Sequence, residues 1–224
     1  MQNRSSRAST PHHSVRQTAY ELFQDALLDG RLRPGQLVSQ RDLVDLLHLS
    51  IGALRELLPR LQAEGLIVVL PQRGIQILSI DLPMIRAAFQ MRAALEREAV
   101  LHAVRKMPDE TLRQQRSRHE AILEELKTDA TDEVLDRGQE IDTGFHQLLI
   151  QSMGNDLIKQ AYDINFIRIR LINLDRIRLS SQILPDAFAE HFVVIDAILS
   201  RDPARAAVAM DDHITHARDR ALEL

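Results

Sequence analysis

An aspartate and a histidine lie four positions apart in the segment DTGFHQLLI, residues 142–150. On a helix of about 3.6 residues per turn, Asp142 and His146 project from the same face. That face is otherwise apolar, with Phe145 and Leu149 beside the pair, and burial of an unpaired charge is costly. The spacing therefore predicts either a buried hydrogen bond between the two side chains or shared ligation of a cation.

Two further histidines interrupt apolar helical faces later in the chain. His191 continues the face of Phe188 and Ile195, and His213 continues the face of Met210. A single inward histidine is more often a hydrogen-bonded core residue than a ligand, so the metal hypothesis depends on the whole set. Three imidazoles and one carboxylate suit Zn²⁺, Ni²⁺, Co²⁺, Fe²⁺ or Mn²⁺. We expect a divalent ion, with zinc or nickel the best candidates, at Asp142, His146, His191 and His213.

The other histidines are not expected to bind metal. His102 and His119 lie in more polar surroundings, and His216 falls on the solvent side of its segment. Glu190 adjoins His191 in sequence but falls on a different helical face. No carboxylate is clearly placed as a general base, so we expect no enzymatic activity, and metal-dependent catalysis is a remote alternative.

Two arginines, Arg92 and Arg168, also stand on helical faces that are otherwise apolar. Each can form an internal ion pair, for instance with Glu96 or Asp175, or extend its guanidinium to solvent. The sharper interpretation is a clamp for a carboxylate ligand, because a guanidinium matches a carboxylate in two-point geometry. Both arginines are therefore candidate effector-binding residues.

These candidates must be positioned by an all-helical region, residues 81–224. No strand pattern follows Leu82, and each expected break carries turn residues such as proline, glycine or serine. We expect an antiparallel helical bundle, in which ligand sites lie in the core between facing helices. The expected helices are Leu82–Lys106, Pro108–Thr128, Thr131–Met153, Asp156–Leu179, Leu184–Ser200 and Pro203–Leu224.

The preceding region, residues 15–80, has the pattern of a winged helix-turn-helix with a small β-hairpin wing. Three amphipathic segments, TAYELFQDALLDG, SQRDLVDLLHLS and IGALRELLPRLQAEGL, predict helices. Ser39 is a candidate N-cap of the second, and Pro59 is expected to bend the third. LIVVLPQRGIQILSI predicts a hairpin. The third helix of such a unit can enter the DNA major groove; a protein-interaction module is the alternative.

Composition sets the remaining bounds. Residues 1–14 are polar and basic and are expected to form a disordered arm. Up to Ile80 every basic residue other than histidine is an arginine, and arginines outnumber acidic residues, whereas the remainder is acidic and the net charge is −4. The absence of cysteine excludes disulfides and thiolate ligands and suits a cytoplasmic location. No apolar run approaches the roughly 20 residues of a membrane span.

Several motifs together resemble a known family. GRLRPGQLVSQRDLVDLL, LSIGALRELLPRLQAEGLI and PQRGIQI follow one another, and MRAALEREAV, DTGFH, GNDLI, EHFVVIDAI and MDDHI come later. From about Val15 onward the chain is similar to the GntR transcriptional regulators, in the subfamily with an all-helical FCD ligand-binding domain (FadR/VanR-like). Six helices after the wing resemble the VanR-like branch more than the FadR-like branch.

The resemblance implies roles for individual residues and partners. Asp142, His146, His191 and His213 match the metal ligands of the family, and Arg92 matches an arginine that meets the carboxylate of the effector. Such proteins form homodimers, bind palindromic double-stranded operators, and release them when a small organic acid binds.

The resemblance also carries DNA-contact positions onto this chain. This chain departs from the family pattern directly after Ser50, the residue that opens the recognition helix. Ile51 occupies a position where an arginine is common in the family. Isoleucine cannot make a bidentate contact to guanine, although it can pack on a thymine methyl group. The expected DNA-binding residues are Arg41, Ser50, Arg55, Arg73 and Gly74.

These expectations combine into a DNA-binding transcriptional regulator, modulated by a small organic acid at a metal site in its helical domain. A regulator that senses the metal ion directly is the alternative.

Overall fold

The computed structural model describes residues 15–175 and 180–223, and the chain divides into two compact units between Ser79 and Ile80. The expected arm, residues 1–14, and the end of the fourth expected bundle helix, residues 176–179, lie outside the described residues. Each unit is described by itself below.

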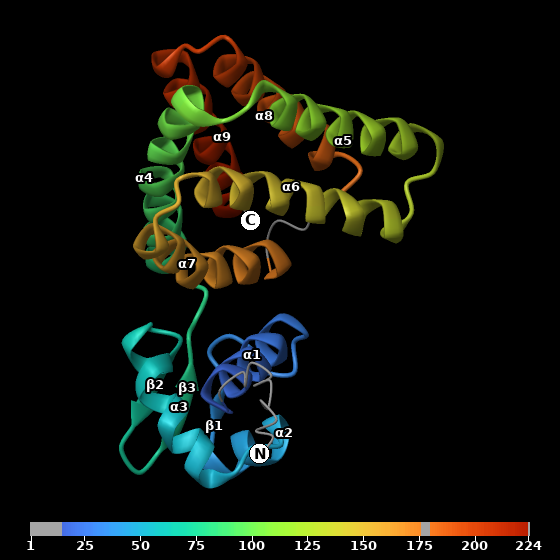
Figure 1. Cartoon of the computed structure of the whole chain (residues 1–224). Helices are drawn as coiled ribbons and strands as arrows, with labels where there is room; N and C mark the ends of the chain where they lie inside the picture. Colours follow the sequence, from blue (N-terminus) through green and yellow to red (C-terminus); the bar gives the residue numbers. More distant parts are fainter. Residues whose placement is uncertain (1–14, 176–179, 224) are drawn as a thin grey trace, which may run out of the picture. The chain divides into compact units, whose positions relative to one another are not determined.

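The first unit holds three helices, α1 (Val15–Leu28), α2 (Gln40–Leu47) and α3 (Ile51–Ala63) (Figure 1). Ser39 caps α2 in a capping box with Asp42, as the sequence predicts. Ser50 caps α3, and its hydroxyl accepts a hydrogen bond from the amide of Ala53. The α3 helix is not interrupted at Pro59, which lies exposed in its interior.

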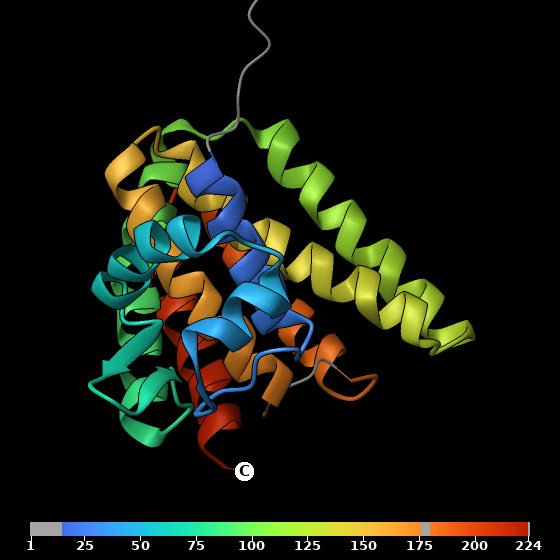
Figure 2. The same cartoon turned by 90° about the horizontal axis from the view of Figure 1, so that it is seen from below.

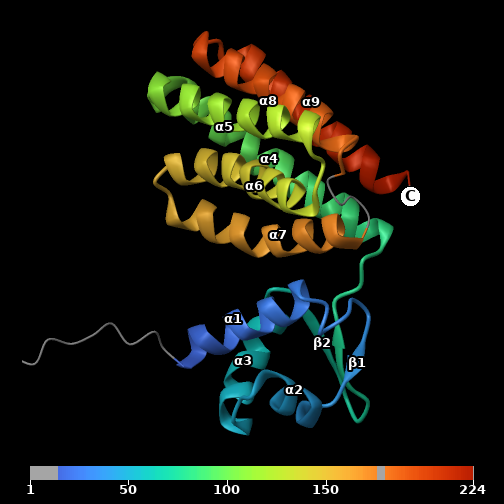
Figure 3. The same ribbon diagram turned by 90° about the vertical axis from the view of Figure 1, so that its right-hand side faces the viewer.

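The wing is a hairpin of β2 (Ile67–Leu70) and β3 (Gly74–Ile77). A two-residue strand, β1 (Leu37–Val38), pairs with the other edge of β3 and gives the order β1-β3-β2 (Figure 3). No strand was expected at Leu37–Val38, so β1 is an addition to the predicted wing. Gly74 has a φ of +119°, and a Cβ there would lie 2.7 Å from the carbonyl oxygen of Val38. Only glycine fits this start of β3.

The second unit is a bundle of six helices among the described residues. The central helix α4 packs against α6, α7, α8 and α9. Helix α5 lies beside α6, and α6 beside α7, as Figures 2 and 3 show. The helices are α4 (Leu82–Lys106), α5 (Asp109–Thr128), α6 (Asp132–Ser152), α7 (Asp156–Asp175), α8 (Ile183–Leu199) and α9 (Pro203–Leu222).

The starts of these helices follow from local chemistry. The side chains of Asp81, Thr131 and Asp202 accept hydrogen bonds from backbone amides in the first turns of α4, α6 and α9. Pro203 occupies the first turn of α9, where its missing N–H has no helical acceptor to lose. Apart from the end of α7, which was expected in residues 176–179 outside the described range, the bounds agree with the sequence prediction to within one or two residues. The predicted fold class is confirmed.

A glycine allows a close approach between α6 and α8. Gly138 on α6 is buried, and a Cβ built there would lie 2.5 Å from a methyl carbon of Leu184 on α8. The two helices therefore approach more closely at this point than any larger residue allows. No helix within the described ranges is long and apolar enough to cross a membrane.

Candidate metal centre and nucleic-acid interface

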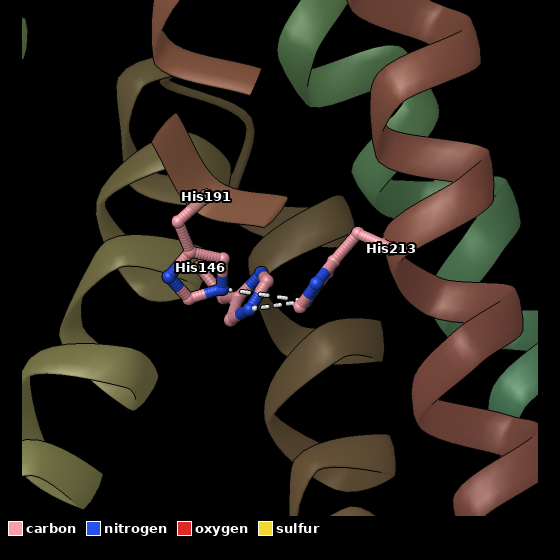
Figure 4. A group of neighbouring side chains, drawn as sticks. All are labelled: His146, His191 and His213. Carbon is pink, nitrogen blue, oxygen red and sulfur yellow. Dashed lines mark hydrogen bonds between the residues drawn. The ribbon is translucent and has the colours of Figure 1, made fainter. Parts of the chain in front are cut away.

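Three histidines from three helices of the bundle meet in its core. His146 lies on α6, His191 on α8 and His213 on α9, and all three are at most 2% exposed (Figure 4). The Nε2 atom of His213 is 3.2 Å from that of His146 and 3.3 Å from that of His191. One ring nitrogen from each histidine lies within 4.8 Å of the others. The cluster thus brings three nitrogen atoms that could bind a metal ion close together.

The outer nitrogens of two of these rings contact buried or half-buried carboxylates. The Nδ1 atom of His146 is 2.5 Å from Oε2 of Glu96, and Nδ1 of His213 is 2.7 Å from Oε2 of Glu190. An ionised carboxylate only accepts hydrogen bonds, so each Nδ1 carries the proton and donates it. In the neutral form of each ring, the Nε2 atom then holds a lone pair that faces the centre of the cluster.

His191 reaches the same state through a fourth histidine. Its Nδ1 is 2.9 Å from Nε2 of His119, and Nδ1 of His119 is 2.7 Å from the backbone carbonyl oxygen of Gln115. The expectation that His119 lies in polar surroundings is wrong, because this residue is 0% exposed. Its neighbours in the apolar stripe of α5 are Leu112 and Ile122, at helical spacing. That stripe is visible in the sequence and could have identified it.

The aspartate of the opening motif lies at the edge of the cluster. Oδ1 of Asp142 is 3.6 Å from Nε2 of His191, and its side chain is 16% exposed. Its other oxygen accepts a hydrogen bond of 3.5 Å from the amide of Gln139. All four residues that the sequence nominates as ligands are therefore neighbours, with Asp142 on the more open side.

Burial favours the neutral forms of His191 and His213. It lowers the pKa of His191 well below the ordinary value, and the charges of His213 and His146 lower it further. Burial lowers the pKa of His213 to about 4, although its hydrogen bond to Glu190 opposes the shift. Neutral imidazoles are the form that binds metal ions, so the rings are in the competent state near neutral pH.

A buried ion pair adjoins His146. Nε of Arg92 donates to Oε1 of Glu96 at 2.7 Å, and a terminal nitrogen of Arg92 lies 2.7 Å from Nε2 of His146. Burial opposes the ionisation of Glu96, but the charges of Arg92 and His146 outweigh it and lower its pKa to about 2. The sequence offered an Arg92–Glu96 pair as one of two interpretations, and the structure contains it.

A small cavity opens beside this pair between α4, α6 and α7. It measures about 20 Å³, and polar groups of Arg92, Asp142 and Tyr162 contribute to its wall. About 10–15 Å³ of such volume holds one water molecule, so the cavity as it stands admits one or two. Its lining residues are Arg92, Asp142, Thr143, His146, Tyr162, Asn165, Phe166, Ile169 and Asn173.

The second nominated arginine lies elsewhere. Arg168 lines a separate groove between α4 and α7, with Met84, Met91 and Ile164, and does not line the cavity beside the histidines. It donates a hydrogen bond of 3.1 Å to the carbonyl oxygen of Ile164. The stripe on α7 predicts that Arg168 is partly buried but not which neighbouring helix it faces.

The residues nominated for DNA contact belong to the first unit. Arg41 on α2 and Arg55 on α3 are exposed, and the side chain of Arg41 is 90% accessible. Arg73 is exposed in the turn of the hairpin, directly before Gly74. The hydroxyl of Ser50 accepts a hydrogen bond from the backbone amide of Ala53, so Ser50 caps the start of α3. The arginines have the exposure that contact with a phosphate backbone or a base edge requires.

Together the two units define a class of protein, a winged-helix DNA-binding domain joined to a helical bundle with a buried histidine cluster. Comparison with known families agrees. The bacterial regulatory proteins of the gntR family match residues 15–77, and the FCD domain matches residues 87–216. The chain belongs to the GntR family of transcriptional regulators, in the group with an FCD domain.

Individual relatives are distant but extend over most of the chain. The HTH-type transcriptional repressor GlaR of Escherichia coli K12 is 27% identical over 198 residues, 87% of this chain and 90% of GlaR. The HTH-type transcriptional repressor RspR of the same organism is 25% identical over 213 residues, which are 91% of this chain and 87% of RspR. The solved structure of E. coli McbR/YncC superposes with a TM-score of 0.72 at 15% identity, covering 94% of this chain and 98% of McbR/YncC.

Proposed function

We propose that this regulator binds a palindromic operator as a homodimer, and that a small carboxylate at a divalent metal site in the bundle changes its affinity for DNA. The observation that carries the proposal is the convergence of the Nε2 atoms of three buried histidines, in which the Nδ1 atoms of two rings contact carboxylates. The repressor names of GlaR and RspR support repression as the mode of regulation.

The donor set fits a divalent ion such as Zn²⁺ or Ni²⁺. Two nitrogens bound to one tetrahedral zinc at about 2.0–2.1 Å lie about 3.3–3.4 Å apart, close to the 3.2 and 3.3 Å between the Nε2 atoms. His146, His191 and His213 would hold the ion, and Asp142 would complete the set from the open side. Glu96 and Glu190 orient the rings as outer partners, an arrangement typical of metal-binding histidines.

Arg92 links this site to the effector cavity. The Nε2 atom of His146 has one lone pair, which serves either the guanidinium of Arg92 or a metal ion. Ligation of an ion by His146 would therefore release one end of Arg92, while Nε of Arg92 would stay bonded to Glu96. The released nitrogen belongs to a residue that lines the cavity, where it can pair with the carboxylate of an effector. A bound divalent ion would act as a Lewis acid toward an oxygen of the effector.

The size of the cavity suggests how binding changes the protein. Even a two-carbon acid is larger than the one or two water molecules that about 20 Å³ admits. An effector must therefore displace Tyr162, Phe166 or other parts of α7 from α6. A ligand shifts an equilibrium only through its different affinity for the two states, and movement of α7 provides such a difference. Arg168 does not line this cavity as it stands.

In the first unit, we propose that α3 enters the major groove with the hairpin beside it. Arg41, Ser50, Arg55, Arg73 and Gly74 are the expected contact residues. The exposure of the three arginines and the N-cap position of Ser50 support this role. Action on DNA places the protein in the cytoplasm of a bacterium.

Two observations weigh on the alternatives. Glu96 and Glu190, the glutamates bonded to the cluster, have pKa values lowered to about 2 and are weak bases, so we propose no enzymatic activity. The small size of this cavity favours direct sensing of the metal ion as a second candidate function.

The discriminating experiment is operator binding. DNA segments flanking the gene of this protein are titrated in chelator, with added Zn²⁺ or Ni²⁺, and with a series of small carboxylates. A response to acid only in the metal-loaded protein supports the proposal, and a response to metal alone supports direct sensing. A protein that binds none of these segments at moderate salt refutes both.

A further inference from the structure

The fourth histidine, His119, is buried in the bundle outside the proposed ligand set. It is 0% exposed and lies between α6 and α8 among aromatic rings. The ring of Phe188 is 4.3 Å away and that of Phe145 is 5.7 Å away, centroid to centroid. An imidazole is an expensive choice for so apolar a place, because both of its nitrogens need partners.

Both partners are present, and they determine where each proton lies. The carbonyl oxygen of Gln115 can only accept, so Nδ1 of His119 donates to it at 2.7 Å. In a neutral ring the Nε2 atom is then an acceptor. His191 must therefore donate from its Nδ1 across 2.9 Å. This leaves the Nε2 atom of His191 without a proton and directed at His213, 3.3 Å away.

We infer that His119 is a positioning residue that fixes the tautomer and ring orientation of His191, so that its Nε2 atom is available to the metal ion. Asp142 lies 3.6 Å from Nε2 of His191, but the Nδ1 atom of His191 has no carboxylate partner like those of His146 and His213. His119 takes that place at Nδ1, and is itself held by a backbone carbonyl. A neutral partner adds no charge to a core that already contains Glu96 and Arg92. The inference rests on the proposed metal site.

The contrast between two substitutions separates positioning from packing. In His119→Met, an apolar side chain fits the aromatic surroundings but cannot accept from His191, which is then free to take the other tautomer. In His119→Gln, the amide oxygen can accept from Nδ1 of His191. Loss of such an outer partner typically costs 10–100-fold in metal affinity. We therefore expect that loss in His119→Met and recovery to within about threefold of wild type in His119→Gln.

The measurement is the affinity of the full-length protein for Zn²⁺ and Ni²⁺, by competition with a chromogenic chelator, with His102→Met as the control for removal of a histidine. Long-range ¹H–¹⁵N NMR spectra of the imidazoles, recorded in chelator, report the tautomer of His191 directly. We expect a protonated Nδ1 in wild type and His119→Gln, and a different tautomer distribution in His119→Met.

Two results overturn the inference while leaving the proposed function intact. One is wild-type affinity in His119→Met. The other is an equal loss in His119→Met and His119→Gln, which shows that only packing matters. If the wild-type protein itself binds neither ion, the proposed metal site fails, and this inference fails with it.

Discussion

Replacement of Arg92 by glutamine removes a buried contact that metal binding must break. In the structure one nitrogen of Arg92 lies 2.7 Å from Nε2 of His146, and another donates to Glu96 at 2.7 Å. Glutamine retains a donor that can reach toward Glu96 but has no positive charge. The substitution thus empties the position beside Nε2 of His146 and leaves the carboxylate partner of that ring in place.

The expected change is a gain in metal affinity. A hydrogen bond to a charged group contributes about 1.5–3 kcal/mol, and each 1.4 kcal/mol corresponds to a factor of about ten. Loss of the competing guanidinium should therefore tighten metal binding by about tenfold or more, and removal of a nearby positive charge acts in the same direction. Stability should fall by about 1–3 kcal/mol, because Glu96 is 0% exposed and loses part of its pairing.

The assay is metal titration in the presence of a competing chelator, followed by operator binding with and without small carboxylates. The Arg92→Gln protein should bind metal more tightly yet lose its response to acids. Arg97→Gln is the matched control, because Arg97 lies on the same helix but is exposed and pairs with Asp211. Unchanged or weaker metal binding in Arg92→Gln, relative to Arg97→Gln, would refute the proposed exchange at His146.

Three further predictions concern the bundle. Asp142→Ala should weaken metal binding and abolish the effector response while circular dichroism and operator binding in chelator stay as in wild type; unchanged metal affinity would remove this residue from the site. Gly138→Ala should lower the free energy of unfolding by about 1–3 kcal/mol in urea titrations, because its Cβ would lie 2.5 Å from a leucine methyl carbon on α8, whereas Gly144→Ala, with nothing within 4 Å, should be neutral or stabilising. In chelator, the stability of the bundle should fall as pH falls from about 6.5 toward 4, because His213, with a folded-state pKa of about 4, binds fewer protons when folded than when unfolded; stability that rises over this window contradicts the burial argument.

The sequence patterns predict much of this structure because local chemistry determines it. Capping residues such as Ser39 and Asp202 and the apolar periodicity locate the helices, and the i, i+4 spacing puts Asp142 and His146 on one face. Convergence of His191 and His213 on that face depends on tertiary packing; their inward positions made it a hypothesis, and the family resemblance strengthened it.

What the sequence does not reveal depends on neighbours distant in the chain. His119 and His191 are 72 residues apart, so no local pattern predicts their contact, although the apolar stripe on α5 indicates that His119 faces inward. Arg92 and Arg168 both interrupt apolar stripes, but only the packing of α4 against α6 and α7 decides which of them meets the histidines. Strand β1 is two residues long and is held by pairing with β3, which no local propensity predicts.

The central claim is that metal and carboxylate in the bundle control DNA binding by the winged helix. Fluorescence anisotropy of full-length protein on DNA flanking its own gene, at fixed moderate salt, tests it most directly. We predict specific binding that changes about 30-fold, which corresponds to about 2 kcal/mol of coupling, when metal and a matching small carboxylate are both present. Specific DNA binding whose affinity is the same in chelator, in metal alone and in metal with every acid tested would contradict the account.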